Sequence, residues 1–183
     1  MGTKKQDKLI EKIETLCFMV AATDGISEME GFELDMIQGR IRMLLDAKSA
    51  VTEYEKSGDM KKALSNLKEP LMLTHVMKFG MADHIQAIDK EVSDLLESNP
   101  DNAQAEYEVL LKIHASDIED DYDRKVAMLC IRDVYDIDGS SSIERWAHLV
   151  LGKEWGVSIM KANKWANEFV FPVIEESQKN IEF

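Results

Sequence analysis

The chain has 183 residues, of which 22 are Lys or Arg and 35 are Asp or Glu, so its formal net charge is −13. This acidity disfavours binding to nucleic acid or to an anionic membrane surface, because both require clustered Lys and Arg. It suits divalent cations, a basic protein partner, or solubility alone. The hydrophobic fraction of 45% is ordinary for a globular protein and excludes wholesale disorder.

The sequence gives no sign of export or of membrane insertion. Residues 1–12 are charged and contain no apolar run, so we expect no secretory signal. No stretch approaches the ~18 uninterrupted apolar residues of a membrane-spanning helix. Two cysteines, Cys17 and Cys130, are too few for a disulfide framework, and their apolar neighbours predict reduced core residues. These features predict a cytoplasmic, soluble protein.

Three prolines, nine glycines and abundant Ala, Leu, Met, Glu and Lys predict an all-α protein. We expect a single compact domain over residues 1–183, with about seven to nine helices and a weak boundary near 98–102. In chain order, helices are predicted at 5–23, 27–54, 60–67, 70–79, 82–97, 103–116, 124–137 and 142–155, and from 158 to a kink or end near 171. The tail over 175–183 is expected to be frayed.

The most informative feature is an internal repeat. Residues 24–30 (DGISEME) match residues 138–144 (DGSSSIE) without gaps, with Asp, Gly, Ser and Glu identical. An apolar helix containing a Leu-Cys pair precedes each copy, and a helix follows each. In both copies the Ser and the Glu three residues later have the spacing of a capping box.

Two interpretations of the repeat remain open. In the first, each Asp-Gly is only a tight turn between two helices, with Ser and Glu capping the second helix. In the second, the chain contains a duplicated helical hairpin, and a pseudo-twofold axis brings the two acidic corners onto one face. Neither corner fits an EF-hand loop, because the twelfth position would be Gly31 in the first and Arg145 in the second.

The corners supply the candidate metal ligands. They are Asp24, Glu28 and Glu30 at the first corner, and Asp136, Asp138 and Glu144 at the second. Carboxylate oxygens favour Ca²⁺, Mg²⁺ or Mn²⁺ over thiolate-bound Zn²⁺. His148 follows Glu144 by four residues, so the two either share a metal role or form a surface salt-linked pair.

These residues resemble the TerB-like family of tellurite-resistance proteins, whose fingerprint is an Ala-rich helix ending in Ala-Asp-Gly before an Ile-Ser-x-x-Glu helix start. Here the first copy reads AATDGISEME over residues 21–30, and the second begins at Asp136. The sequence departs from the family at Thr23 and at Ile137, where the family has Ala. The matching positions are Asp24, Ser27, Glu30, Asp138, Ser141 and Glu144.

The resemblance implies an all-helical fold of two pseudo-symmetric halves that is not itself an enzyme. It implies a role in tellurite resistance, stress response or phage defence, with divalent metal bound through acidic residues and with membrane-associated protein partners. We therefore expect a non-enzymatic module that binds a divalent metal, a protein partner (another copy of itself included), or both.

The alternative is a metal-free helical interaction or scaffold protein, for example one encoded by a phage or another mobile element. The third hypothesis is that the chain is an enzyme, and we expect no enzymatic activity. The sequence has no Gly-rich phosphate loop, no His-Glu-x-x-His zinc motif and no Gly-x-Ser-x-Gly elbow. Catalysis would require a pocket with convergent titratable groups.

Overall fold

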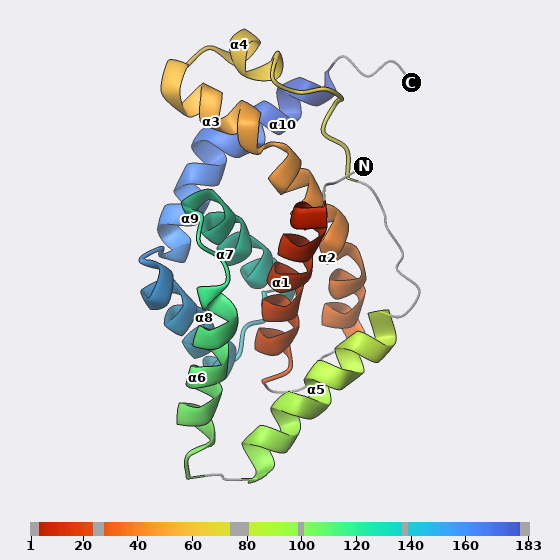
Figure 1. Ribbon diagram of the computed structural model, residues 1–183, viewed down its shortest axis with the longest axis vertical. Coiled ribbons are helices and arrows are strands. Elements are labelled where there is room, and N and C mark those ends of the chain that lie inside the picture. Colours follow the sequence, from red (N-terminus) through yellow and green to blue (C-terminus); the bar gives the residue numbers. More distant parts are fainter. Residues whose placement is uncertain (1–3, 24–27, 74–80, 99–100, 137–138, 180–183) are drawn as a thin grey trace.

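The computed structural model describes residues 4–23, 28–73, 81–98, 101–136 and 139–179, without the side chains of 28–33, 35, 81–85 and 96. Within these ranges the chain is all-helical and contains no strand (Figure 1). The elements are α1 (Lys4–Ala21), α2 (Glu28–Asp46), α3 (Lys48–Ser57), α4 (Met60–Leu64), α5 (Met81–Ser98), α6 (Ala103–Ser116), α7 (Asp121–Tyr135), α8 (Ser142–Trp155), α9 (Ile159–Trp165), a π-helix (Ala166–Val170) and α10 (Phe171–Gln178).

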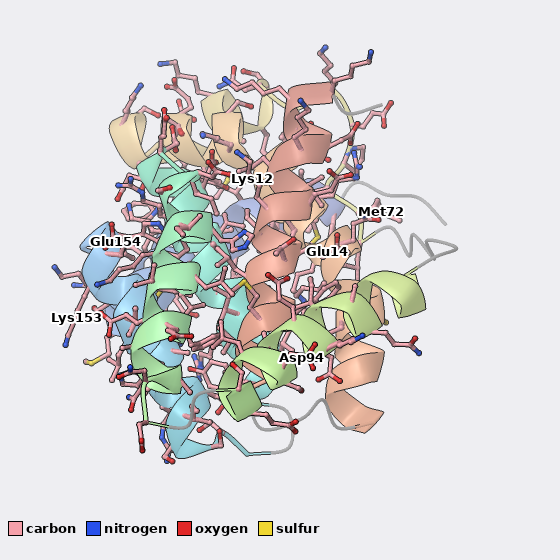
Figure 2. The ribbon with its side chains drawn as sticks, turned by 60° about the horizontal axis from the view of Figure 1, so that its bottom comes forward. Lys12, Glu14, Met72, Asp94, Lys153 and Glu154 are labelled. Atoms are coloured by element: carbon pink, nitrogen blue, oxygen red, sulfur yellow. The ribbon has the colours of Figure 1, made fainter. Side chains whose placement is uncertain are left out.

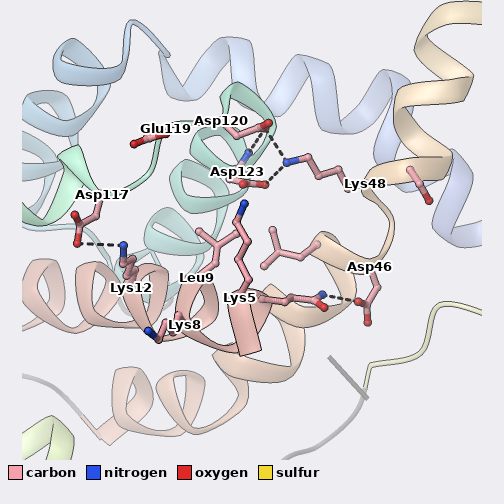
Figure 3. A pocket seen from close by; sticks show the side chains of 13 residues that line it. Lys5, Lys8, Leu9, Lys12, Asp46, Lys48, Asp117, Glu119, Asp120 and Asp123 are labelled. Atoms are coloured by element: carbon pink, nitrogen blue, oxygen red, sulfur yellow. Dashed lines mark hydrogen bonds and ion pairs between the residues drawn. The ribbon is translucent and has the colours of Figure 1, made fainter. Parts of the chain in front are cut away.

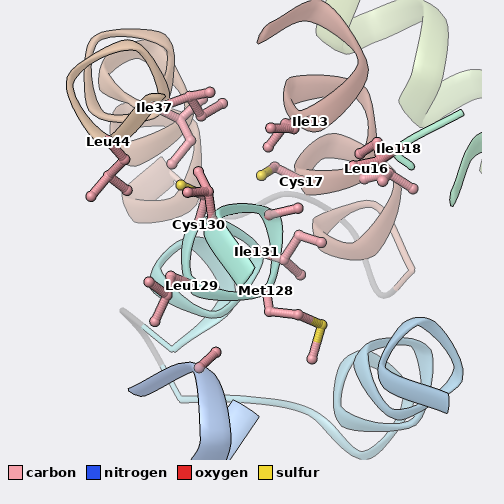
Figure 4. Packing of buried hydrophobic residues seen from close by; sticks show 14 of the residues in the cluster. Ile13, Leu16, Cys17, Ile37, Leu44, Ile118, Met128, Leu129, Cys130 and Ile131 are labelled. Atoms are coloured by element: carbon pink, nitrogen blue, oxygen red, sulfur yellow. The ribbon is translucent and has the colours of Figure 1, made fainter. Parts of the chain in front are cut away.

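Helix α7 lies at the centre of the core. It packs against α1, α2, α8 and α9, and its apolar residues are buried on several sides rather than along one stripe. Cys17 of α1 and Cys130 of α7 are both fully buried free thiols in this core (Figure 4). Burial raises the pKa of the Cys17 thiol well above its ordinary value, with the neighbouring Cys130 adding to the effect. The prediction of core cysteines is confirmed.

The internal repeat corresponds to two helical hairpins, α1–α2 and α7–α8, whose first helices pack side by side. The arrangement is symmetric only in part. Helix α2 packs broadly against α7, whereas α8 packs mainly against α6 and touches α1 less. The helices outside the two hairpins therefore pack differently against the first hairpin and against the second.

The helix predicted over 27–54 is divided in two. Helix α2 ends at Asp46 and α3 begins at Lys48, with Ala47 between them. The backbone of Ala47 still makes helical hydrogen bonds: its N–H donates to the Met43 carbonyl, and its carbonyl accepts from the Val51 N–H. Long-range contacts flank the break, because Asp46 accepts from Gln6 and Lys48 binds Asp123. Periodicity within the segment does not reveal these partners.

The prediction of a helix over 70–79 is wrong for residues 70–73, which are not helical. Residues 74–80 lie outside the described part of the chain. Leu71 is buried in an irregular segment whose backbone binds side chains of α10. The Leu71 N–H donates to Ser177 Oγ, and its carbonyl accepts from Gln178 Nε2 at 2.8 Å. These bonds replace the ones that a helix would have made.

The C-terminal helical segment begins as predicted, with Ser158 capping α9, and it extends further than predicted. A π-helix precedes Pro172, which lies in the first turn of α10, where its missing N–H is tolerated. Helix α10 then continues to Gln178, and Ile174 and Ser177 are buried. Residues 175–178 are therefore an ordered part of the fold, which corrects the expectation of a frayed tail.

Candidate functional site

The second acidic corner joins α7 to α8. Helix α7 ends at Tyr135, and Gly139 has a φ of 101°, a left-handed conformation that favours glycine. Ser141 caps α8: its Oγ accepts from the Glu144 N–H at 3.2 Å, and Glu144 Oε2 accepts from the Ser141 N–H at 2.7 Å. The predicted capping box is therefore present at this corner. Its counterpart at Ser27 lies outside the described residues.

The carboxylate of Glu144 is almost completely enclosed. The residue is 2% exposed, and its Oε1 atom is buried with no hydrogen-bond partner in the described part of the chain. A buried carboxylate oxygen with no partner is costly, because its hydration is lost and nothing replaces it. This oxygen is therefore the feature of the corner that the capping box does not explain.

Tyr107 of α6 connects this corner to the helix that leads into the first corner. Its hydroxyl donates to the Met19 carbonyl in the last turn of α1 at 2.6 Å. Its ring lies 6.2 Å from that of Trp146 in the first turns of α8. Burial raises the pKa of Tyr107, and the charge of Glu144 raises it further. The end of α1 and the start of α8 thus lie at the same end of the molecule, the lower end in Figure 1.

The structure describes only some of the six predicted ligands, and it places these in different surroundings. Asp24 and Asp138 lie outside the described residues, as do the side chains of Glu28 and Glu30 in α2. Asp136 is exposed at the end of α7, and its carboxylate lies 3.4 Å from the guanidinium of Arg132. Glu144 is the buried member. Among the described residues, no three His, Cys, Asp or Glu side chains are grouped so that they could hold a metal ion.

A buried polar contact next to this corner was not predicted from the sequence. Tyr135 of α7 and His148 of α8 are both buried, and the Tyr135 hydroxyl lies 2.5 Å from His148 Nδ1. The pKa of His148 is lowered to about 4, mainly by burial and also by the charge of Arg132, while a hydrogen bond with the Met128 backbone opposes the shift. Burial raises the pKa of Tyr135 to about 12.

Glu144 and His148 are thus not a surface pair, because both side chains point into the protein. The signal was in the sequence: the two residues share one face of α8 with Ala147, Leu151 and Trp155, all of which are buried. This spacing marks the core-facing side of a helix.

Removing the Ser141 hydroxyl tests how much the capping box contributes to the free energy of unfolding. Ser141→Ala is expected to lower the free energy of unfolding by about 1 kcal/mol, because the Glu144 N–H loses its acceptor. Denaturant unfolding measures the change. Ser98→Ala, at the exposed end of α5 where the hydroxyl donates to the Leu95 carbonyl of the same helix, is the control and should stay within about 0.5 kcal/mol. Equal losses in the two variants would contradict a stabilising capping box.

A separate open groove of about 960 Å³ lies between the N-terminal half of α1, the α2–α3 junction and the segment that leads into α7 (Figure 3). Its charged lining residues are Lys5, Lys8, Lys12, Lys48, Asp46, Asp117, Glu119, Asp120 and Asp123. The groove therefore combines both signs of charge, and Leu9 and Leu45 contribute apolar surface.

Most charges in the groove engage one another. Lys12 lies 3.2 Å from Asp117, and the Lys48 amine lies 2.9 Å from both Asp120 and Asp123. Burial raises the pKa of Asp123, whereas the hydrogen bond from Lys48 opposes that rise. Asp120 also caps α7 by accepting from backbone N–H groups. The groove is thus held together by its own ion pairs and offers little net charge to a ligand.

No protein-family model matches this chain, and neither a curated protein nor a solved structure is significantly similar to it. Among the described residues, every helix falls short of the length and apolarity that crossing a membrane requires. The likeness to the TerB-like family therefore rests on the residues of the two corners.

Proposed function

We propose that this chain is a non-enzymatic, TerB-like module of stress or tellurite response, which binds a divalent cation and a protein partner at its two acidic corners. The observation that carries the proposal is the buried Glu144 carboxylate, whose Oε1 atom has no hydrogen-bond partner among the described residues. A cation would supply the compensation that this oxygen lacks. The link from Tyr107 to both Met19 and the start of α8 supports the idea that the two corners cooperate.

The residues fit a hard cation rather than a soft one. Glu144 offers a carboxylate oxygen, and the sequence adds Asp24 and Asp138 at the two Asp-Gly turns. Oxygen donors suit Ca²⁺, Mg²⁺ or Mn²⁺, whereas the two cysteines, the residue type that Zn²⁺ favours, are buried in the core. When bound, the ion would neutralise the carboxylates and hold the corners in one conformation.

The capping box favours the second candidate function, a metal-free interaction or scaffold protein. Ser141 and Glu144 already close the corner by bonding each other's backbone. In that case the repeat is a turn motif, and a protein partner binds the surface near it, where Asp136 is exposed. This alternative includes a protein that is encoded by a phage or another mobile element.

A thermal melt of chelator-stripped protein distinguishes the two functions. Ca²⁺, Mg²⁺, Mn²⁺ and Zn²⁺ are added separately at equal ionic strength. An ion that binds the folded state, present at ~100 times its Kd, stabilises by about 2.7 kcal/mol. We expect such a shift for one of the three hard cations. The double variant Asp24→Asn with Asp138→Asn should abolish the shift and leave the helical circular dichroism intact.

Glu144→Gln is the sharper variant, because glutamine can keep the capping box and removes the charge. It should melt close to the parent protein without metal and lose most of the stabilisation by metal. Glu119→Gln makes the same chemical change at an exposed position outside the corners and should keep the full metal effect. An absence of any ion-specific shift in the parent protein, or an equal loss in both Gln variants, would reject the metal function.

A further inference from the structure

Helix α6 exposes an apolar pair on the side that faces away from the core. Its inner side buries Tyr107 and Leu111 completely. On the opposite side, Val109 and Ile113 are 58% and 59% exposed. They are four residues apart, so they stand one above the other on the same face of the helix. What distinguishes them from the other exposed apolar residues of the described chain is that they adjoin on one helix face.

An ion pair flanks this apolar ridge. Lys112 Nζ lies 2.6 Å from Glu108 Oε1, and both side chains are substantially exposed. Glu108 raises the pKa of Lys112, and Glu154 of the neighbouring α8 adds a smaller contribution. Figure 2 shows Glu154 and Lys153 of α8 beside α6 at the surface. The outer face of α6 thus combines an apolar centre with a border of both charges.

We propose that the outer face of α6 is the contact between two copies of this chain, packed antiparallel about a two-fold axis level with residues 110 and 111. The spacing of the residues favours a second copy as the occupant. With the axis between residues 110 and 111, Val109 of one copy lies about one residue's rise (~1.5 Å) from the level of Ile113 of the other. Glu108 and Lys112 have the same small offset, so both pairs come within contact distance across the axis.

The charges make this face self-complementary. Each copy brings one acid and one base to the flank, so a two-fold contact creates two more opposite-charge pairs and no like-charge pair between them. Elsewhere, a net charge of −13 opposes self-association. A ridge of residues at four-residue spacing also suits the commonest class of helix packing, in which such ridges interdigitate. A contact made by one helix per copy is small, so the dimer is reversible and dilution dissociates it.

Sedimentation equilibrium of the full chain at physiological ionic strength, which screens the repulsion between two acidic copies, tests the proposal by mass action over a roughly hundredfold range of concentration. The parent protein should pass from monomer to dimer across the range. Ile113→Glu should stay monomeric, because a carboxylate would then face the apolar centre and its acidic neighbours. Met160→Glu, at a 79% exposed position on α9, introduces the same charge elsewhere and should dimerise like the parent.

A charge exchange tests the register. Glu108→Lys and Lys112→Glu should each weaken the dimer, because each places like charges opposite one another across the axis. The double variant restores opposite charges and should recover dimerisation. Circular dichroism and a melt of the dilute monomer verify that each variant folds. A parent protein that remains monomeric, a Met160→Glu variant as impaired as Ile113→Glu, or a double variant without recovery would overturn the proposal.

Discussion

Acidification from pH 7 to below pH 4 is expected to remove about 3 kcal/mol of stability through His148 alone. The ordinary pKa of 6.5 applies to the unfolded chain, and burial lowers the pKa in the folded protein to about 4. The unfolded state therefore binds a proton first as the pH falls below 6.5, whereas the folded state stays neutral. The stabilising effect is complete above pH 6.5 and is lost progressively down to about pH 4.

Unfolding by denaturant at pH 7, 5.5 and 4 measures this effect when the parent protein is compared with His148→Gln. The variant loses the Tyr135 contact and is less stable at pH 7, but its stability should fall less steeply with acid. His114→Gln, at a partly exposed position on α6, controls for the loss of a histidine as such. Equal pH dependence in the parent and in His148→Gln would contradict a buried neutral His148.

A truncation in the core between α1 and α7 is expected to have an effect of similar or larger size. Leu16 is fully buried on α1 in the cluster that contains Cys17 and Ile131 (Figure 4). Leu16→Ala removes apolar contacts and leaves a cavity, and such changes cost about 2–5 kcal/mol. Proteins are typically stable by about 5–15 kcal/mol, so this loss would be a substantial fraction of the total.

Leu149→Ala is the matched control, because Leu149 lies on α8 with 62% of its surface exposed. Its expected cost is within about 0.5 kcal/mol. Chemical denaturation of both variants gives the two values, and circular dichroism verifies the helical content. Similar losses at the two positions would mean that the α1–α7 contact is not the centre of the fold.

The sequence was sufficient for the features that depend on neighbours along the chain. Apolar residues at helical spacing gave most of the helices, and the Ser-x-x-Glu spacing gave the capping box of Ser141 and Glu144, which the structure confirms. The apolar surroundings of Cys17 and Cys130 also gave their burial correctly. In each of these cases the deciding interactions lie within one or two turns.

The features that the sequence did not predict depend on partners far along the chain. The end of α2 at Asp46 lies beside Gln6, and the non-helical course of Leu71 depends on Ser177 and Gln178. The contact of His148 with Tyr135 joins two different helices, although the apolar face of α8 was sufficient to indicate that His148 is buried. Local pattern cannot supply these contacts, because each requires that the relative positions of two elements be known.

An NMR titration of chelator-stripped, ¹⁵N-labelled protein with Ca²⁺, repeated with Mg²⁺ and Mn²⁺, tests the central proposal most directly. The proposal predicts saturable changes for one ion at the amides of residues 19–23 and 139–146 and at Tyr107, with those of residues 5–12 unaffected. Glu144→Gln should remove these changes, and Glu119→Gln should preserve them. Changes confined to the charged groove, or weak shifts spread over all exposed carboxylates without saturation, would contradict a cation site at the two corners.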